Sequence, residues 1–230
     1  MKFIYLRLKL KTQNPVYPMK NLFIYSALAG MMFTACNSPE KKTEENAQTA
    51  DNATPAEARH YFIDVHELGN VNFADVEAAH QKDLATQGKY GVNFEKFWVD
   101  EKAGKVYCLS EAKDSASVVQ THKEAHGLIP VAVYEVTSGG NDAAMTGKPM
   151  FIDVHEAGPG QLTPEAVAEI HKKDLANEGK HNVNFVNYYL DQKQGMVFCI
   201  SEAADPSDIQ ATHTESGAPA NYVVAVREGK

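Results

Sequence analysis

Aspartate, histidine and cysteine occur together twice in this chain of 230 residues. Asp64 and His66 are two positions apart, so in a strand their side chains point the same way. Cys108 lies on another segment of strand-like sequence. Carboxylate, imidazole and thiol groups are ligands of transition metals. The set therefore predicts a metal site, and it returns at Asp153, His155 and Cys199.

A second set follows helical spacing. His122 and His126 are four residues apart, the spacing at which two imidazoles on one helix face can share a metal. His80 and Asp83 are three residues apart, so Asp83 could also hold the tautomer of that imidazole. The later counterparts are His171, Asp174 and His213, with Gly217 in place of His126.

A structural role for these residues is the alternative. A buried cysteine usually behaves as a small apolar residue, and one histidine on a helix is usually hydrogen-bonded. Seven of the nine histidines nevertheless fall in these two sets, and six of them form repeat-related pairs. We therefore predict at least one divalent transition-metal site. No CxxC spacing is present, so spacing alone does not name the metal.

The recurrence reflects a tandem duplication. The hexapeptide FIDVHE at 62–67 recurs unchanged at 151–156, and VNF at 92–94 recurs at 183–185. Order and spacing hold between these matches. The polar, glycine-containing residues 138–148 predict a linker between the copies.

Each copy alternates between strand and helix patterns. In the first copy, short β-branched or alternating segments predict strands at 61–67, 94–99, 106–110 and 131–136. Longer segments with helical periodicity predict helices at 73–87 and 115–126. This βαββαβ order predicts an α+β protein with two ferredoxin-like modules, residues 60–137 and 149–230. Such a sheet has both helices on one face. We expect the two bare faces to pack together as an intramolecular pseudo-dimer.

This arrangement assigns the two sets to different faces. The apolar sides of the strands are expected to meet the helices, which leaves Asp64, His66 and Cys108 on the open face. His80 and His122 are expected on the helical side. On this hypothesis the two sets cannot serve one ion.

The N-terminal part of the sequence predicts a secretion signal. Residues 19–36 have a basic start and a short apolar stretch, and they end in FTAC, which resembles a bacterial lipobox. We expect residues 1–36 to form the signal region, with Met19 as the true start and Cys36 as the lipidated residue. Plain secretion is the alternative. Residues 37–59 contain no aromatic or β-branched apolar residue and predict a disordered tether.

The charge excludes one class of partner. After Cys36 the chain carries 17 basic and 30 acidic residues, without the basic stripe that nucleic-acid binding requires. The expected partners are a metal ion and, through the lipid anchor only, a membrane. Whether there is a protein partner is left open by the sequence.

The motifs FIDVHE, AAHQKDLA, YGVNFEKFWVDEKAGKVYCLSEA and THKEAHG resemble a family of bacterial nickel-binding, nickel-responsive proteins with a ferredoxin-like fold. The resemblance covers residues 61–136 well and residues 150–227 less closely. It implies a metal, with nickel favoured. Single-domain members of the family are dimers, which agrees with two copies in one chain.

The second copy departs from the family pattern in two places. Tyr189 stands where the first copy has Trp98, and Gly217 stands where it has His126. The second helix site is therefore expected to be a weaker chelate or to recruit His181.

Three functions follow from these observations. The leading hypothesis is a lipid-anchored protein of the cell envelope, on the periplasmic or outer-membrane side, that binds, buffers or senses a metal and is not an enzyme. The second is an α/β-barrel enzyme whose cavity between the repeats is lined by Trp98, Tyr189, His66 and Cys108. The third is a binding module whose histidines are structural.

Overall fold

The computed structural model describes residues 58–140 and 143–230. The predicted signal region, Cys36 and nearly all of the predicted tether lie outside the described residues. Within the described ranges, no helix is long and apolar enough to cross a membrane.

The two copies contain the same order of elements. The first contains β1 (His60–Glu67), α1 (Phe73–Tyr90), β2 (Asn93–Asp100), β3 (Lys105–Ala112), α2 (Ser115–Ala125) and β4 (Ala132–Ser138). The second contains β5 (Met150–Glu156), α3 (Pro164–Asn177), the 3-10 turn η1 (Glu178–Lys180), β6 (Asn184–Asp191), β7 (Met196–Glu202), α4 (Pro206–Ser216) and β8 (Tyr222–Gly229). Three of the four long helices begin after an aspartate or asparagine side chain that accepts a backbone N–H, and α3 begins after a threonine that does so.

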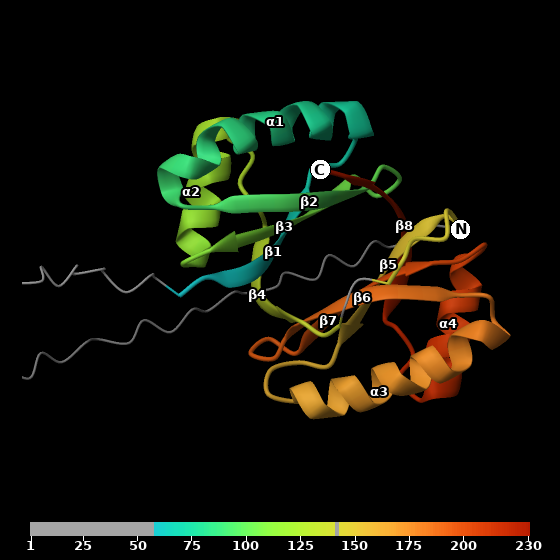
Figure 1. Ribbon diagram of the computed structural model, residues 1–230. Coiled ribbons are helices and arrows are strands. Elements are labelled where there is room, and N and C mark those ends of the chain that lie inside the picture. Colours follow the sequence, from blue (N-terminus) through green and yellow to red (C-terminus); the bar gives the residue numbers. More distant parts are fainter. Residues whose placement is uncertain (1–57, 141–142) are drawn as a thin grey trace, which may run out of the picture. The chain divides into compact units, whose positions relative to one another are not determined.

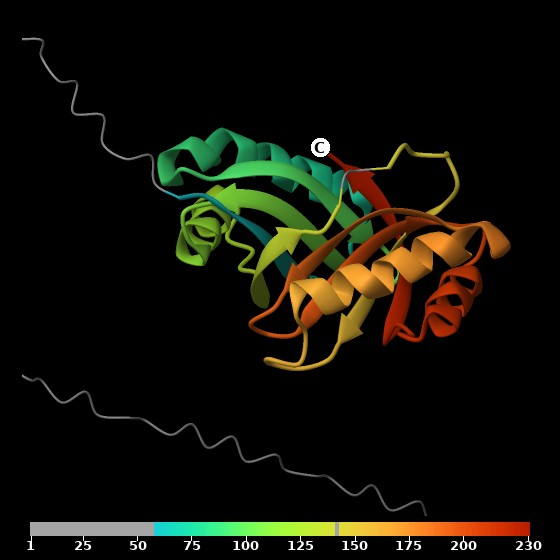
Figure 2. The ribbon, with the colours of Figure 1, turned by 60° about the horizontal axis from the view of Figure 1, so that its bottom comes forward.

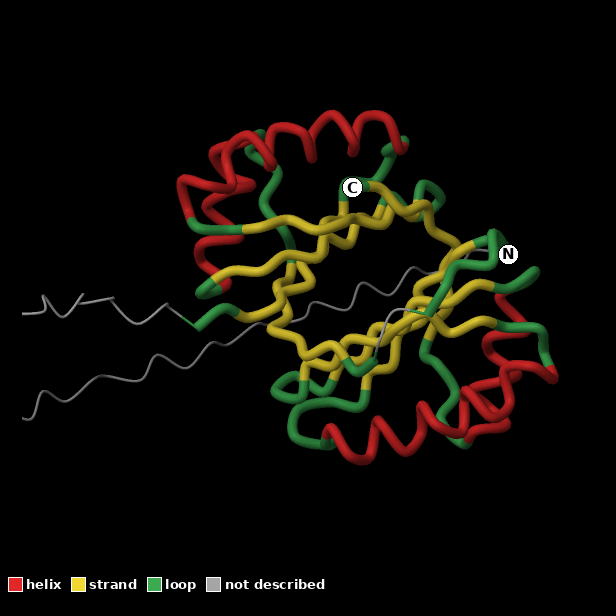
Figure 3. The backbone as a smooth tube through the Cα atoms, in the orientation of Figure 1, coloured by secondary structure: helices red, strands yellow, loops and turns green. Residues whose placement is uncertain are grey.

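The strands form one closed antiparallel barrel in the order β1-β3-β2-β8-β5-β7-β6-β4. Figures 1 and 3 show this ring of strands, with α1 and α2 outside one half and α3 and α4 outside the other. The view in Figure 2 shows the same arrangement from a second direction. The barrel closes at two seams between the copies, β2 with β8 and β4 with β6.

The predicted fold class is therefore wrong. The chain does not form two ferredoxin-like modules packed face to face as a pseudo-dimer. A free four-stranded sheet has two edge strands with unpaired backbone N–H and C=O groups. The copies pair these edges with each other, so the sheet rolls up and its helix-free face becomes the barrel interior.

Closure also reverses the predicted faces of the strands. The barrel interior is filled by apolar side chains from both copies, including Ile63, Trp98, Tyr107, Ile152 and Phe198. The opposite face of the first copy packs on its helices through a second apolar cluster that includes Cys108. The interior of a closed barrel is cut off from water on every side, so it takes the uniformly apolar face of each strand. Polar residues are left on the helix-covered side.

A glycine lies against an aromatic ring at each seam. Gly229 pairs with Phe97 across β8 and β2, and the Gly139 N–H donates to the Tyr188 carbonyl at 2.9 Å. A Cβ atom on Gly229 would lie 2.2 Å from Phe97 Cζ, and one on Gly139 would lie 1.7 Å from Tyr188 Cζ. Both rings are buried, so the seams require residues without a side chain here.

We expect Gly229→Ala and Gly139→Ala each to lower the free energy of unfolding by about 1–3 kcal/mol, because the added methyl group displaces a packed ring. Urea denaturation monitored by circular dichroism measures the change. Gly140→Ala is the control, because its Cβ would meet only Asn187 Oδ1 at 3.7 Å. Equal stability of all three variants would contradict the role given to the seam glycines.

Candidate metal centres

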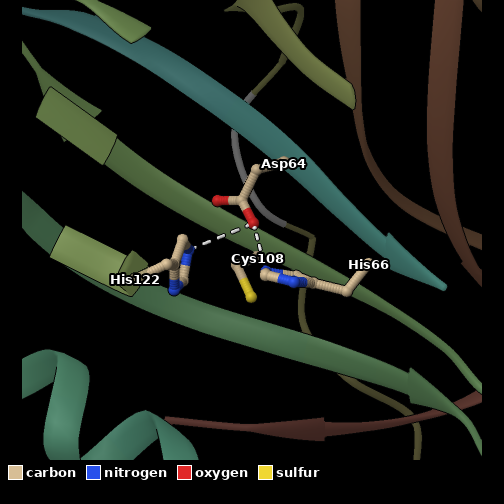
Figure 4. Close-up of side chains that lie close together, drawn as sticks. All are labelled: Asp64, His66, Cys108 and His122. Carbon is tan, nitrogen blue, oxygen red and sulfur yellow. Dashed lines mark ion pairs between the residues drawn. The ribbon is translucent and has the colours of Figure 1, made fainter. Parts of the chain in front are cut away.

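The first cluster joins two strands and a helix. Asp64 and His66 lie on β1, and Cys108 lies directly opposite Asp64 on β3. The helix α2 brings His122 over them (Figure 4). All four residues are buried, and each offers a ligand atom within 4.8 Å of the others. Carboxylate, imidazole and thiol groups thus converge on one point.

The polar atoms of this cluster are poorly satisfied by the protein. Asp64 Oδ1 lies 2.9 Å from His66 Nε2 and 3.2 Å from His122 Nε2. Neither contact has the geometry of a hydrogen bond, and among the described residues both Asp64 oxygens, His66 Nδ1 and His122 Nε2 have no hydrogen-bond partner. Burying such atoms unpaired costs free energy. A cation among them would remove part of that cost, so the donor set fits a metal ion.

His122 lies between two carboxylates. Its Nε2 faces Asp64, and its Nδ1 lies 3.0 Å from Asp83 Oδ1 on α1. His126 Nε2 lies 3.3 Å from the same Nδ1 and 3.2 Å from Asp83 Oδ2. A carboxylate behind a ligating histidine orients the ring and selects its tautomer. Asp83, His122 and His126 form a further group of possible metal ligands, so His122 faces a possible site on each side.

Electrostatics hold a proton at this position in the metal-free protein. Burial alone would lower the pKa of His122, but Asp64 and Asp83 outweigh burial and raise the pKa to about 10. Burial likewise would raise the pKa of Asp64, but His122 and His66 hold it at about 2. Burial, with Asp64 nearby, raises the pKa of the Cys108 thiol well above its ordinary value. A metal must therefore displace protons from His122 and, if sulfur ligates, from Cys108.

The second copy repeats the arrangement with Asp153, His155, Cys199 and His213. His213 Nε2 lies 2.8 Å from Asp153 Oδ1, and His213 Nδ1 lies 3.1 Å from Asp174 Oδ1. His155 Nε2 is 3.5 Å from Asp153 Oδ1, a looser contact than its counterpart. Burial lowers the pKa of His213, but Asp153 and Asp174 raise it to about 10 overall.

The expected separation of the two sets is wrong. His122 and His213 reach the strand residues of their own copies, because the face that carries Asp64 and Asp153 is covered by helices. His126 approaches Asp83 and His122, as its spacing predicted.

Two predicted ligands lie apart from these clusters. His80 packs against the ring of Phe97 with centroids 4.7 Å apart, and His171 packs against Tyr188 at 4.8 Å. Among the residues that the structure describes, neither belongs to a group of converging ligand atoms. His181 does not replace the missing His126, because its Nε2 instead lies 3.1 Å from Glu215 Oε2.

Asp83 and Asp174 have a larger part in the clusters than their spacing predicts. The spacing pairs Asp83 with His80, whereas in the structure Asp83 contacts His122 and His126. Asp174 contacts His213 in the same way. Recurrence of this aspartate in both copies was the available signal.

The residues expected to line a catalytic cavity are divided by the barrel wall. Trp98 and Tyr189 lie inside the barrel, with ring centroids 6.3 Å apart. His66 and Cys108 lie on the outer, helix-covered face. The four therefore do not share a cavity between the repeats.

A family described as nickel responsive protein SCO4226-like matches the chain twice, at residues 62–136 and 151–226. These matches confirm the tandem repeat. The solved structure of SCO4226 from Streptomyces coelicolor A3(2) is 31% identical, covers 32% of this chain and 90% of its own, and has a TM-score of 0.31. No curated protein matches the chain.

Other solved structures match over more of the chain at low identity. A putative monooxygenase from Lactobacillus acidophilus NCFM is 10% identical, covering 75% of this chain and 94% of its own, with a TM-score of 0.46. A mutant chlorite dismutase from Candidatus Nitrospira defluvii is 6% identical, covering 75% and 91%, with a TM-score of 0.45.

The raised pKa values of His122 and His213 predict how stability depends on pH in the metal-free protein. A histidine whose pKa rises from 6.5 to about 10 on folding stabilises the folded state fully below pH 6.5, and this contribution is lost as the pH rises toward 10. We expect the free energy of unfolding to fall between pH 7 and pH 10, by up to roughly 4 kcal/mol for each of the two histidines. Urea denaturation with a chelator present, at constant ionic strength, measures it.

The control separates these histidines from tyrosine and lysine titration. His122→Gln removes one titrating group and should flatten the pH dependence, whereas His60→Gln changes an exposed histidine that pairs with Glu135 and should not. If His122→Gln and His60→Gln have the slope of the parent, His122 is not held protonated by its carboxylates.

Proposed function

Since the chain belongs to the SCO4226-like family of nickel responsive proteins, we propose that it binds nickel(II) at the two buried clusters described above. The observation that carries the proposal is the first cluster, where carboxylate and imidazole atoms converge without hydrogen-bond partners. The role is to bind, buffer or sense the ion, without chemical turnover of a substrate.

The donor set suits this metal. Imidazole is a preferred ligand of nickel, and carboxylate and thiolate complete a mixed set. In the first copy, His66, His122, Asp64 and Cys108 would hold the ion. Asp83 would accept the Nδ1 proton of His122 and keep Nε2 free for the metal. His213 and Asp174 supply the same pair in the second copy.

Protons and nickel compete for these side chains. His122 and His213 carry a proton at neutral pH in the metal-free protein, because each lies between two aspartates. Binding to their Nε2 atoms therefore releases protons, and nickel affinity rises with pH up to about pH 10. This dependence extends well beyond the range near pH 6.5 expected for an ordinary histidine.

We propose further that the protein is held at a membrane of the cell envelope by a lipid on Cys36. The support is the sequence FTAC after a basic start and a short apolar stretch. Residues 37–59 would then act as a tether of low hydrophobicity between the lipid and the barrel.

We expect the parent protein to bind one nickel ion at each of the two clusters. His122→Ala and His213→Ala should each remove one binding event, and the double variant should remove both, because each histidine joins the strand and helix parts of one cluster. Asp83→Asn should weaken one site by about 10–100-fold. Calorimetric titration with elemental analysis of the dialysed protein measures these values.

Two further comparisons distinguish the loss of a ligand from misfolding. His66→Ala and Cys108→Ser each remove a ligand of the first cluster that lies on a strand and leave the helix residues unchanged. Either variant should weaken one nickel site only. His60→Ala should bind nickel as the parent does, because His60 is exposed and belongs to neither cluster. If the folded His122→Ala/His213→Ala variant binds nickel with parental stoichiometry, the clusters are not the nickel sites.

The lipid anchor has its own test. We expect the full-length parent to fractionate with membranes and to carry a lipid mass on Cys36, whereas Cys36→Ala should be soluble. Membrane fractionation and mass spectrometry of the N-terminal peptide measure both. A Cys36→Ala protein that stays with membranes and has lost no lipid mass would contradict the anchor.

A further inference from the structure

The two clusters differ in the space beside them. A pocket of about 280 Å³ adjoins the second cluster and reaches His155, His171, Asp174 and Cys199. The matching pocket beside the first cluster is lined by equivalent positions but encloses only about 80 Å³. The copies have thus diverged at the approach to their ligands.

Several lining positions differ between the copies, and three of the differences remove side-chain volume near the second pocket, although Leu162 and Ile170 are larger than Val71 and Ala79 of the first copy. The second copy has Ala157, Gly217 and Pro219 where the first has Leu68, His126 and Leu128. Each replacement removes side-chain volume from the pocket wall. The consequence is visible in burial, since the first copy buries His66, Val76 and His80 whereas the second leaves His155, Val167 and His171 partly exposed.

The enlarged pocket has an apolar body and a ligand-bearing floor. Leu162, Val167, Ile170 and Val197 form much of its wall. The floor is made by residues of the cluster, among them His155 and Cys199. Gly217 replaces His126, which in the first copy lies 3.3 Å from His122 Nδ1, whereas His122 Nε2 faces Asp64. This replacement therefore removes side-chain volume near the pocket without removing a residue of the second cluster.

We propose that this pocket binds a small, uncharged organic molecule with an apolar body and a nitrogen donor, and that the donor reaches the second cluster beside His155 and Cys199, which line the pocket. The approach to the first cluster is narrow, and the approach to the second is wide. A metal site that a small molecule can reach accepts exogenous ligands.

Size and charge define the class of ligand. A cavity of about 150 Å³ accommodates benzene, so a pocket of about 280 Å³ accommodates a ring with a short alkyl chain. Glu156 and Asp174 line the pocket and Asp153 belongs to the adjoining cluster, which disfavours an anionic ligand. An imidazole nitrogen is only weakly basic, so it is largely neutral at about pH 8, and it is a preferred donor to nickel.

The coordination step rests on the proposed function, whereas occupation of the pocket does not. The full chain is therefore titrated with 1-butylimidazole at about pH 8, metal-free and nickel-loaded. In the metal-free protein, methyl NMR signals of Val167 and Ile170 should shift, while those of Val76 and Ala79 in the first copy should not. Nickel should tighten the binding roughly tenfold or more, and the probe should tighten one of the two nickel-binding events by the same factor.

Ala157→Leu is the matched variant, because it restores the residue that the first copy has at this position. This variant should lower the affinity for 1-butylimidazole by roughly tenfold or more, because the leucine side chain fills the cavity. It should leave the stoichiometry of nickel binding unchanged. Unshifted Val167 and Ile170 signals, or equal binding by Ala157→Leu, would overturn the pocket. Binding that nickel does not tighten would overturn the coordination step.

The two proposals fail in different ways. If nickel does not bind but the probe shifts Val167 and Ile170, the proposed function is wrong and the pocket stands. If nickel binds at both clusters but the probe shifts neither signal, the proposed function stands and this inference is wrong.

Discussion

The contact on which this structure depends is a buried histidine between two aspartates, made once in each copy. In the first copy His122 on α2 contacts Asp64 on β1 and Asp83 on α1. The contact therefore joins a barrel strand to both helices that cover it. Removing either carboxylate would leave a buried charge with one partner fewer, which is far more costly than losing an exposed ion pair. This constraint keeps the ligand atoms close together in the absence of a metal.

The barrel explains why the polar residues can be buried on the outer face. Its interior takes large apolar side chains from both copies and forms a core of its own, separate from the apolar clusters under the helices. The layer between strands and helices can then carry several charged residues, provided that they contact one another. The same layer brings residues from three elements together at each cluster, which no single strand or helix could do.

Duplication within one chain allows the two copies to differ. In a dimer of identical subunits, any substitution would enlarge both pockets or neither. Here Leu68 closes the first pocket while Ala157 opens the second, and the carboxylate–imidazole–carboxylate contacts persist in both. The two clusters thus keep the same residue types and differ in the space beside them.

Local patterns were sufficient for the order of elements, the duplication and the residue types at the clusters. FIDVHE has one periodicity in both copies, so Asp64 and His66 must share a face in any fold built on these strands. Periodicity could not determine whether that face points into the barrel or toward the helices, because both faces of β1 carry apolar residues. The pairing of β2 with β8 and of β4 with β6 closes the barrel and thereby decides which face of each strand points inward. With the barrel closed, Asp64 points toward the helices, His122 lies over it and Asp83 contacts His122. These contacts join distant segments and depend on which strand edges pair, and local sequence does not determine that pairing.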